Sequence, residues 1–312
     1  ILVGRSRQAL PLHCKVVSPS PSTPLAVDTM KRLTSSLWRL GGRSGIVLGQ
    51  QIPRTGPTTL PCAVRAFAQP TSSSGMQVFD DEVSVAIQDG VAIITLTAED
   101  GEFEWGTKRA EHRWNPITVK ALSNALDSVE TNSAVNVVVL ANKGKYWSNG
   151  MDLKYLEKHG STGGKELGEN INGLMTRVCC FPLPTVAAIS GHFCAAGGMM
   201  GLAFDFRVMS SDRGLFFIPG VDLGLVYGRL QMEVMAAKLP QNMHREVILF
   251  NSKRWVAEEL LAKGAVDAIA PAADVLPKAL EIAGQLKPKG QGAARKALGG
   301  IKRGLYKAVL EA

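Results

Sequence analysis

Apolar and polar positions alternate regularly from about residue 80 onward. Two short apolar runs, residues 83–88 and 91–97, flank Asp89-Gly90 and predict a β-hairpin with a two-residue turn. Asn115-Pro116 then places a cap residue before a proline, which is typical of a helix start. A buried face for this helix is predicted by apolar residues at helical spacing, namely Leu122, Ala125, Leu126 and Val129.

Two later apolar runs each end in a turn of small residues. Residues 135–141 lead into GKYWSNGMDLK at 144–154, and Thr185–Ile189 lead into SGHFCAAGGMMGLAFD at 190–205. A strand, a tight turn and a helix start leave backbone N–H groups unpaired, and small side chains let a ligand oxygen approach them. This arrangement suits an anion or a developing oxyanion. Close packing of helix on sheet is the alternative interpretation, and the second stretch by itself favours it.

The segments between these runs complete an α/β pattern in the order strand, strand, helix. Residues 99–111 are charged and contain glycine, which predicts an exposed loop. A polar, glycine-rich segment at 159–168 precedes a predicted helix at 171–178, and residues 242–312 are predicted to form helices. No apolar run reaches the length of a membrane span, so no transmembrane segment is expected.

The formal net charge of +8 belongs to the first part of the chain. Residues 1–79 hold nine Lys or Arg and a single acid, whereas residues 80–312 hold 26 of each sign. A neutral body gives no electrostatic reason to expect a nucleic-acid partner. The Arg-, Ser- and Pro-rich extension favours an organellar transit peptide, with the mitochondrial matrix as first choice and the plastid as second. A tail without an address is the alternative.

The five cysteines have no metal-ligand spacing, so the sequence predicts no metal site. Cys194 lies in the second turn, but the sequence places no histidine to activate it, and we interpret this cysteine as structural. The last four residues, Val-Leu-Glu-Ala, do not match the Ser-Lys-Leu type of peroxisomal address.

The two turns together resemble those of the enoyl-CoA hydratase/isomerase (crotonase) superfamily. YWSNGMDL at 146–153 resembles the first turn of that family, and GHFCAAGG at 191–198 resembles the second. Further similarity lies in HRWNPITVKAL at 112–122, AFDFRVMSSDRGLFFIP at 203–219 and LGL at 223–225. These segments span about residues 80–270, and they are most similar to plant-type Δ3,Δ2-enoyl-CoA isomerases.

This resemblance implies an α/β fold, a crotonase-type spiral of ββα units with a C-terminal helical trimerisation region. It divides the chain into a basic extension at 1–79, a crotonase core at 80–270 and a C-terminal helical region at 271–312. The extension is then a transit peptide or an anchoring arm. The implied assembly is a homotrimer or a trimer with paralogues, within a larger mitochondrial complex.

The implied ligand is an acyl-CoA thioester, and no separate cofactor is expected. Two backbone N–H groups, those of Met151 and Ala196, would hold the thioester carbonyl oxygen as an oxyanion hole. The substrate-binding positions implied by the family turns are Asp152, Leu153, Lys154 and Gly197. Of these, Asp152 is better interpreted as a structural acceptor, and Lys154 fits a solvated surface as well as it fits a cation near CoA.

The chain departs from the family where enolate chemistry needs a side-chain base. The positions that carry family glutamates hold Met199, Gly220 and Gly228. Asp222 is the candidate for a relocated base, because an offset of two keeps the same face of an extended segment, about 6–7 Å further along. Glu233 and His192 are weaker candidates.

Two functional hypotheses follow from these substitutions. In the first, the chain is a non-catalytic structural or acyl-CoA-binding subunit of a mitochondrial assembly, because loss of a general base lowers the rate by about 10² to 10⁴. In the second, it is an active Δ3,Δ2-enoyl-CoA isomerase of fatty-acid β-oxidation that uses Asp222. The sequence favours the first by a small margin, since fold alone does not imply function.

Overall fold

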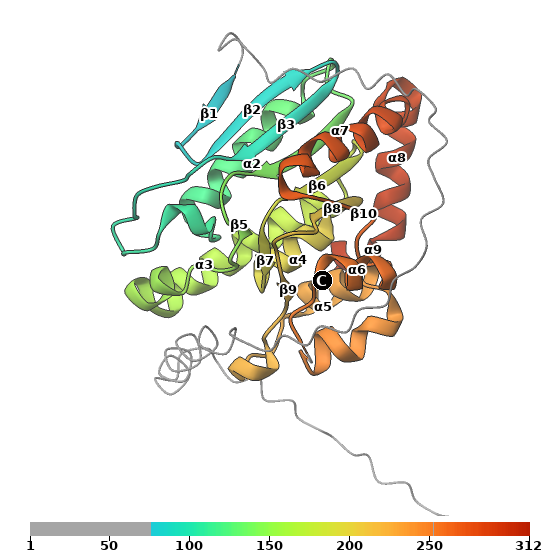
Figure 1. Cartoon of the computed structure of the whole chain (residues 1–312). Helices are drawn as coiled ribbons and strands as arrows, with labels where there is room; N and C mark the ends of the chain where they lie inside the picture. The colour runs from blue at the N-terminus through green and yellow to red at the C-terminus, as the bar shows by residue number, and fades with distance from the viewer. Residues whose placement is uncertain (1–75, 252) are drawn as a thin grey trace, which may run out of the picture.

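The computed structural model describes residues 76–251 and 253–312, and these form two β-sheets surrounded by helices (Figure 1). The larger sheet has seven strands in the order β1-β2-β3-β4-β6-β8-β10. Its first three strands pair antiparallel, and the others pair parallel. The strands are β1 Gln77–Phe79, β2 Val83–Gln88, β3 Val91–Leu96, β4 Val137–Asn142, β6 Thr185–Ile189, β8 Phe206–Ser210 and β10 Ala268–Ala270.

The predicted hairpin is confirmed. β2 pairs with β3 from Val83 opposite Leu96 to Gln88 opposite Val91. Asp89 and Gly90 both have positive φ, 48° and 74°, which is the backbone of a tight two-residue turn between twisted strands. β1 adds Gln77–Phe79 to the edge of this sheet, residues that the sequence analysis assigned to the extension.

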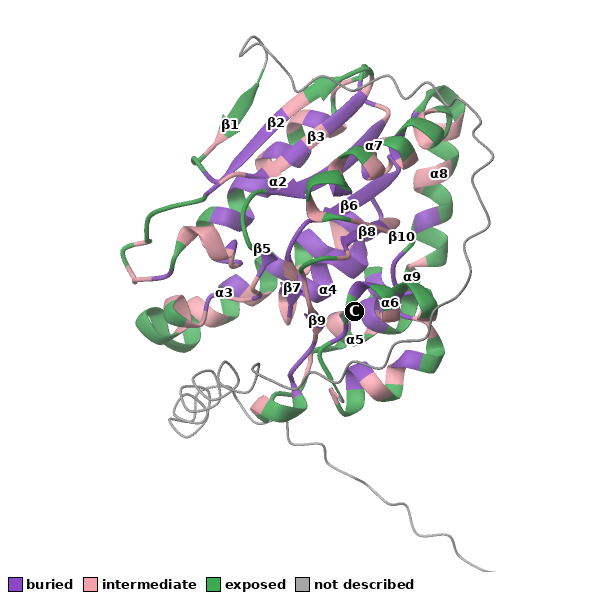
Figure 2. Cartoon of the chain, in the orientation of Figure 1, coloured by how far each residue is buried: buried purple, intermediate pink, exposed green. Residues whose placement is uncertain are grey.

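Helices cover both faces of the larger sheet. Alternate residues of β4 point to opposite sides, so Val137 and Val139 contact α7 while Val138 and Leu140 join the larger core under α2, α3 and α4. The central strands are therefore buried along their whole length (Figure 2). The helices are α2 Pro116–Glu130, α3 Leu153–Cys179, α4 Ala196–Ala203, α5 Arg229–Lys238, α6 Ala257–Lys263, α7 Val275–Leu286, α8 Gly292–Leu305 and α9 Lys307–Leu310.

The start of α2 at Pro116 is confirmed, and its cap explains it. The Asn115 side-chain oxygen accepts hydrogen bonds from the N–H groups of Ile117 and Thr118, each at 3.0 Å. These bonds satisfy two of the donors that every helix start leaves unpaired. The predicted apolar stripe of this helix is buried, with Ala125 and Val129 completely inaccessible to solvent.

Two predicted boundaries are wrong. The glycine-rich segment at 159–168 is not a linker, because α3 runs from Leu153 to Cys179 and breaks its helical geometry only at Gly160, where φ is 65°. Packing of Leu167 and later residues on the core outweighs the low helix propensity of glycine. The C-terminal part is not wholly helical either, since Ala268–Ala270 forms strand β10 beside β8.

The last long helix, α8, is anchored by a charged residue. Lys302 is buried, and its ammonium donates to the Leu183 carbonyl oxygen at 2.8 Å and to the Asp205 carboxylate at 2.5 Å. Ile301 and Leu305, in contrast, are exposed on the same helix. Within residues 76–251 and 253–312, no helix combines the length and apolar character needed to cross a membrane.

Candidate functional site

The smaller sheet brings the two family-like turns together. It consists of β5 Tyr146–Ser148, β7 His192–Cys194 and β9 Phe216–Phe217, paired in parallel in that order. β5 runs into the first turn and β7 runs into the second. β9 supports the second turn, because the N–H of Ala195 donates to the Phe217 carbonyl oxygen at 2.9 Å.

Glycines allow the turns to touch. Gly150 has a φ of 85°, and a Cβ built on it would lie 3.0 Å from the Ala195 Cβ and 3.3 Å from the Ala196 nitrogen. A Cβ on Gly197 would lie only 2.5 Å from the Ser148 carbonyl oxygen. Any larger residue at these positions would push the two turns apart, so the small residues serve a direct backbone contact.

The N–H groups of Met151 and Ala196 lie at this contact. The peptide around Met151 is held by Trp114, whose N–H donates to the Gly150 oxygen and whose carbonyl accepts from Asp152 N–H. Ala196 is the first residue of α4, and Ala195 before it has the unusual backbone angles φ 51° and ψ −127°. Among residues 76–251 and 253–312, no acceptor is recorded for either N–H. Two donors beside a helix N-terminus can therefore face a ligand oxygen.

Asp152, which follows Met151, is fully buried and engaged with protein donors. Its carboxylate accepts from the Trp105 indole N–H at 2.7 Å and from the Thr107 hydroxyl at 2.6 Å. It also accepts from the Asn115 amide at 3.4 Å and from the Tyr155 backbone N–H at 3.1 Å. The carboxylate therefore fixes the end of the first turn and caps α3.

The loop at 99–111 is not freely exposed, contrary to the prediction. Its Thr107 is buried, and its Trp105 stacks on Phe103 with ring centroids 4.9 Å apart. Lys154 lies on the exposed first turn of α3 and donates its ammonium to the Gly106 carbonyl oxygen. Leu153, the half-buried first residue of α3, completes the turn. The loop is thus attached to α3 by hydrogen bonds that its charged sequence did not indicate.

Neutral groups occupy the space at two of the three positions that carry family glutamates. A Cβ built on Gly220 would lie 2.0 Å from the Tyr227 hydroxyl oxygen, and one on Gly228 would lie 2.6 Å from Gln231 Oε1. The third position, Met199, is an apolar side chain buried in the core. Without a carboxylate, none of the three offers a base for proton transfer from carbon.

Tyr227 and Gln231 are residues that sequence reasoning missed. The Tyr227 hydroxyl and the Gln231 carbonyl oxygen are both buried, and neither has a hydrogen-bond partner among the described residues. The Gln231 amide nitrogen donates to Asn172 of α3 at 2.6 Å. Burial raises the pKa of Tyr227 to about 12, and the nearby charge of Asp222 acts in the same direction. The phenol is therefore a neutral hydrogen-bond donor at physiological pH.

The three candidate bases lie in different surroundings. Asp222 is exposed on the short helical turn Val221–Leu223, and its carboxylate accepts a hydrogen bond from Asn251. Glu233 is half-buried on α5. His192 lies beside Tyr146, with ring centroids 5.3 Å apart, and burial lowers its pKa. No recorded side-chain contact in the described part of the chain joins these three residues to one another.

Cys194 is completely enclosed at the second turn. Its Sγ lies 3.6 Å from the Leu215 carbonyl oxygen, and burial raises the pKa of the thiol to about 12. A thiol with so high a pKa carries almost no thiolate at neutral pH, so it is chemically inert. No cluster of metal-ligating side chains occurs among residues 76–251 and 253–312.

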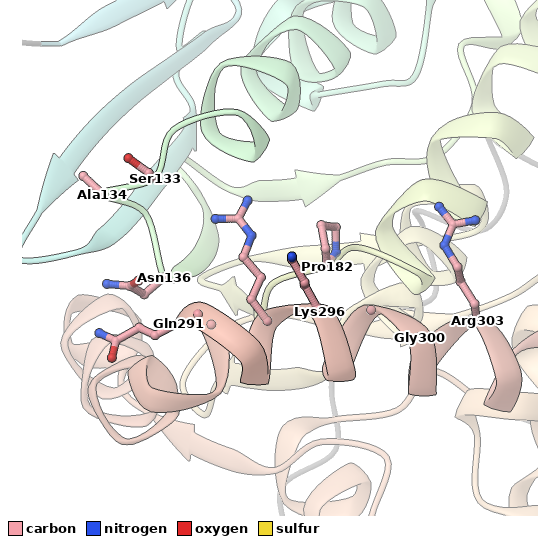
Figure 3. A pocket seen from close by; sticks show the side chains of 12 residues that line it. Ser133, Ala134, Asn136, Pro182, Gln291, Lys296, Gly300 and Arg303 are labelled. Carbon is pink, nitrogen blue, oxygen red and sulfur yellow. The ribbon is translucent and has the colours of Figure 1, made fainter.

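A separate cavity of about 790 Å³ opens beside α8 (Figure 3). Its walls include Ser133 and Asn136 before β4, Pro182 before β6, and Lys296 and Arg303 of α8. β4 and β6 run parallel, and both enter the two turns from their other ends. This cavity therefore lies at the opposite edge of the sheet from the Met151 and Ala196 N–H groups.

Comparison with known proteins agrees with this geometry. The sequence profile of the enoyl-CoA hydratase/isomerase family matches residues 111–309. Enoyl-CoA delta isomerase 3 of Arabidopsis thaliana is 30% identical over 182 residues, which cover 57% of this chain and 72% of that protein. Hydroxycinnamoyl-CoA hydratase-lyase of Pseudomonas fluorescens is 25% identical over 228 residues, covering 71% and 78%.

Solved structures share the fold. A family protein from Pseudomonas syringae superposes with a TM-score of 0.65 at 24% identity, covering 75% of this chain and 95% of that one. A probable enoyl-CoA hydratase from Mycobacterium tuberculosis gives 0.64 at 24% identity, covering 74% and 92%. The profile match extends over more than half of the chain and includes both turns and the C-terminal helices. The chain therefore belongs to the enoyl-CoA hydratase/isomerase family and has the crotonase fold.

Proposed function

We propose that this chain binds acyl-CoA thioesters between the two turns and has lost the proton transfer of an isomerase or hydratase. The observation that carries the proposal is the position of Tyr227, whose hydroxyl fills the space of a side chain at residue 220. A glutamate at that position is what the family resemblance implies for catalysis. In this chain a neutral phenol stands there instead.

Binding is supported by the backbone of the two turns. Met151 and Ala196 direct N–H groups without a recorded partner in the described residues to one contact between the turns. Each oxyanion-hole donor contributes about 3 kcal/mol to the stabilisation of developing charge. The donors are main-chain groups, so they survive the side-chain substitutions that removed the base. A binding site can thus remain where catalysis has been lost.

An active isomerase is the second candidate function. It is favoured by the similarity to three Arabidopsis thaliana delta isomerases, which are 26–30% identical to this chain. Asp222 would have to serve as the base in this case. Its exposure and its hydrogen bond with Asn251 argue against that role, because an exposed carboxylate lacks the raised pKa of an effective general base.

The test combines binding and turnover on the full chain. Butyryl-CoA affinity is measured by calorimetry, and conversion of a 3-enoyl-CoA is followed for wild type and Asp222→Asn. We expect wild type to bind butyryl-CoA without measurable turnover. Wild-type turnover that disappears in Asp222→Asn would establish the isomerase, and turnover that survives in Asp222→Asn would equally exclude the non-catalytic reading. Failure of butyryl-CoA to bind would reject the thioester site.

A rescue variant sharpens this test. Gly220→Glu alone places the new side chain against the Tyr227 hydroxyl, so the glutamate cannot reach a productive position. Combining Gly220→Glu with Tyr227→Ala removes the obstruction. We expect isomerase activity in the double variant and none in either single variant. A double variant that binds butyryl-CoA but remains inactive would indicate that more than the base has been lost.

We also propose that the chain works in the mitochondrial matrix as a trimer or as part of a larger assembly. The basic extension at 1–75 supports import, although it lies outside the described residues. Relatives include a human hydratase-domain protein named as mitochondrial, 28% identical over 162 residues. The exposed Ile301 and Leu305 on α8 favour a subunit contact. A fluorescent fusion and light scattering of the purified chain would test the two statements separately.

A further inference from the structure

The hydroxyl of Tyr227 is a polar group without a partner. Its oxygen is buried, and no donor or acceptor within the described residues forms a hydrogen bond with it. Buried polar groups in native proteins are nearly always paired, because an unpaired one loses its hydration without compensation. An unpaired hydroxyl in a candidate ligand site is therefore a place where a ligand atom can supply the missing partner.

The position of this hydroxyl links it to the second turn. It lies against the backbone of Gly220, 2.0 Å from where a Cβ would be. Gly220 follows Phe217 by three residues, and the Phe217 carbonyl holds the N–H of Ala195. Ala195 directly precedes Ala196, whose N–H is one of the two candidate donors to the thioester carbonyl. The phenol is thus carried on the same short segment that supports the thioester-binding turn.

The chemistry of the phenol is that of a donor. Its pKa is raised to about 12 by burial, so it keeps its proton at physiological pH. Asp222, the nearest acid in the chain, is exposed and accepts from Asn251. Gln231 adds a second neutral group nearby in sequence, with a buried carbonyl oxygen that also lacks a partner among the described residues. Neutral groups that lack partners match a neutral oxygen substituent better than a hydrocarbon or a carboxylate.

We propose that Tyr227 donates its hydroxyl hydrogen to an oxygen on the acyl chain of the bound thioester, so the site selects hydroxyacyl- or oxoacyl-CoA over acyl groups without that oxygen. This inference rests on the proposed function, because it assigns a substrate class to the same site. It makes Tyr227 a specificity-determining residue. A site that is built to hydrogen-bond a ligand oxygen discriminates against analogues that lack it.

The test compares three thioesters on the full chain by calorimetry: butyryl-CoA, 3-hydroxybutyryl-CoA and acetoacetyl-CoA. We expect wild type to bind at least one oxygenated thioester about tenfold more tightly than butyryl-CoA. Tyr227→Phe removes only the hydroxyl, and the ratio of Kd values should fall to about one. Tyr306→Phe, in which the altered ring lies under Lys238 at the C-terminal end of α8, is the matched control and should keep the wild-type ratio.

The outcomes separate this inference from the proposed function. Equal wild-type affinities for all three thioesters, or a preference that survives in Tyr227→Phe, would overturn the inference and leave the thioester site intact. No binding of any thioester would reject the proposed function, and the inference with it. Thermal unfolding without ligand should place Tyr227→Phe at or above wild type, because the variant no longer buries an unpaired hydroxyl. A lower midpoint would indicate a structural role instead.

Discussion

The hydroxyl oxygen of Tyr227 lies 2.0 Å from the point where the Cβ of residue 220 would stand if that residue were not glycine. The two residues are therefore mutually dependent: glycine at 220 makes room for the phenol, and the phenol fills the room that a catalytic side chain would need. The segment between them folds back on itself, since the N–H of Leu225 donates to the Gly220 carbonyl oxygen at 2.8 Å.

A methyl group at residue 220 should expose this dependence. Gly220→Ala forces the new Cβ against the Tyr227 hydroxyl, and we expect a loss of about 1–3 kcal/mol in the free energy of unfolding. In a Tyr227→Ala background the same substitution should be nearly neutral. Urea unfolding of the four proteins in this cycle measures the coupling. Gly284→Ala in α7 is the control, because its new Cβ meets no atom within 4 Å and should stabilise by about 0.5–1 kcal/mol. Additive effects would contradict the assignment.

The Asp152 carboxylate should be a major stabilising group of the first turn. Asp152→Ala leaves Trp105, Thr107 and the start of α3 without their acceptor, and we expect a loss of about 3 kcal/mol in the free energy of unfolding. Asp222→Ala removes a carboxylate on the exposed surface and should change stability by less than about 0.5 kcal/mol. Chemical denaturation compares the two variants directly. Similar losses for both would show that the hydrogen bonds to Asp152 contribute little.

Lys302 should anchor α8 through its buried ion pair. Lys302→Met leaves Asp205 and the Leu183 carbonyl without their cation, and we expect unfolding to become easier by about 3–5 kcal/mol. Arg303→Met, one residue further along the same helix, alters an exposed side chain and should cost less than about 0.5 kcal/mol. Thermal unfolding midpoints give the comparison. An equal effect of both variants would mean that the buried pair is not the anchor.

Acid should destabilise the fold through His112. Its ring nitrogens lie 2.7 Å from the Tyr146 carbonyl oxygen and 2.9 Å from that of Ala98, and burial lowers its pKa below the ordinary value of 6.5. The unfolded chain therefore binds a proton more readily than the folded chain does. The resulting stability is present above pH 6.5 and is lost as the pH falls toward the lowered pKa.

Unfolding midpoints between pH 7.5 and 5.5 test this assignment. The midpoint of wild type should fall with decreasing pH, and the fall should be smaller in His112→Gln, because glutamine does not titrate. His192, whose pKa is also lowered by burial, contributes in the same direction and can be replaced by glutamine separately. An identical pH slope in wild type and His112→Gln would exclude His112 as the source.

Much of the fold was predictable because it depends on local patterns. The Asp89-Gly90 turn, the Asn115 cap and strand Thr185–Ile189 all follow from backbone preferences and apolar periodicity over a few residues. The two small-residue turns were also identified from sequence. Long helix α3 was not, because the glycines around Gly160 lower local helix propensity, and burial of the residues after it overrides that preference.

The sequence by itself determined the family turns, the absence of glutamate at positions 199, 220 and 228, and the neutral charge of residues 80–312. Only the tertiary structure decided what stands at the empty positions. Tyr227 reaches Gly220 because the intervening loop folds back, and Trp105 reaches Asp152 across 47 residues. Such contacts depend on the close packing of segments distant along the chain, which no pattern within either segment encodes.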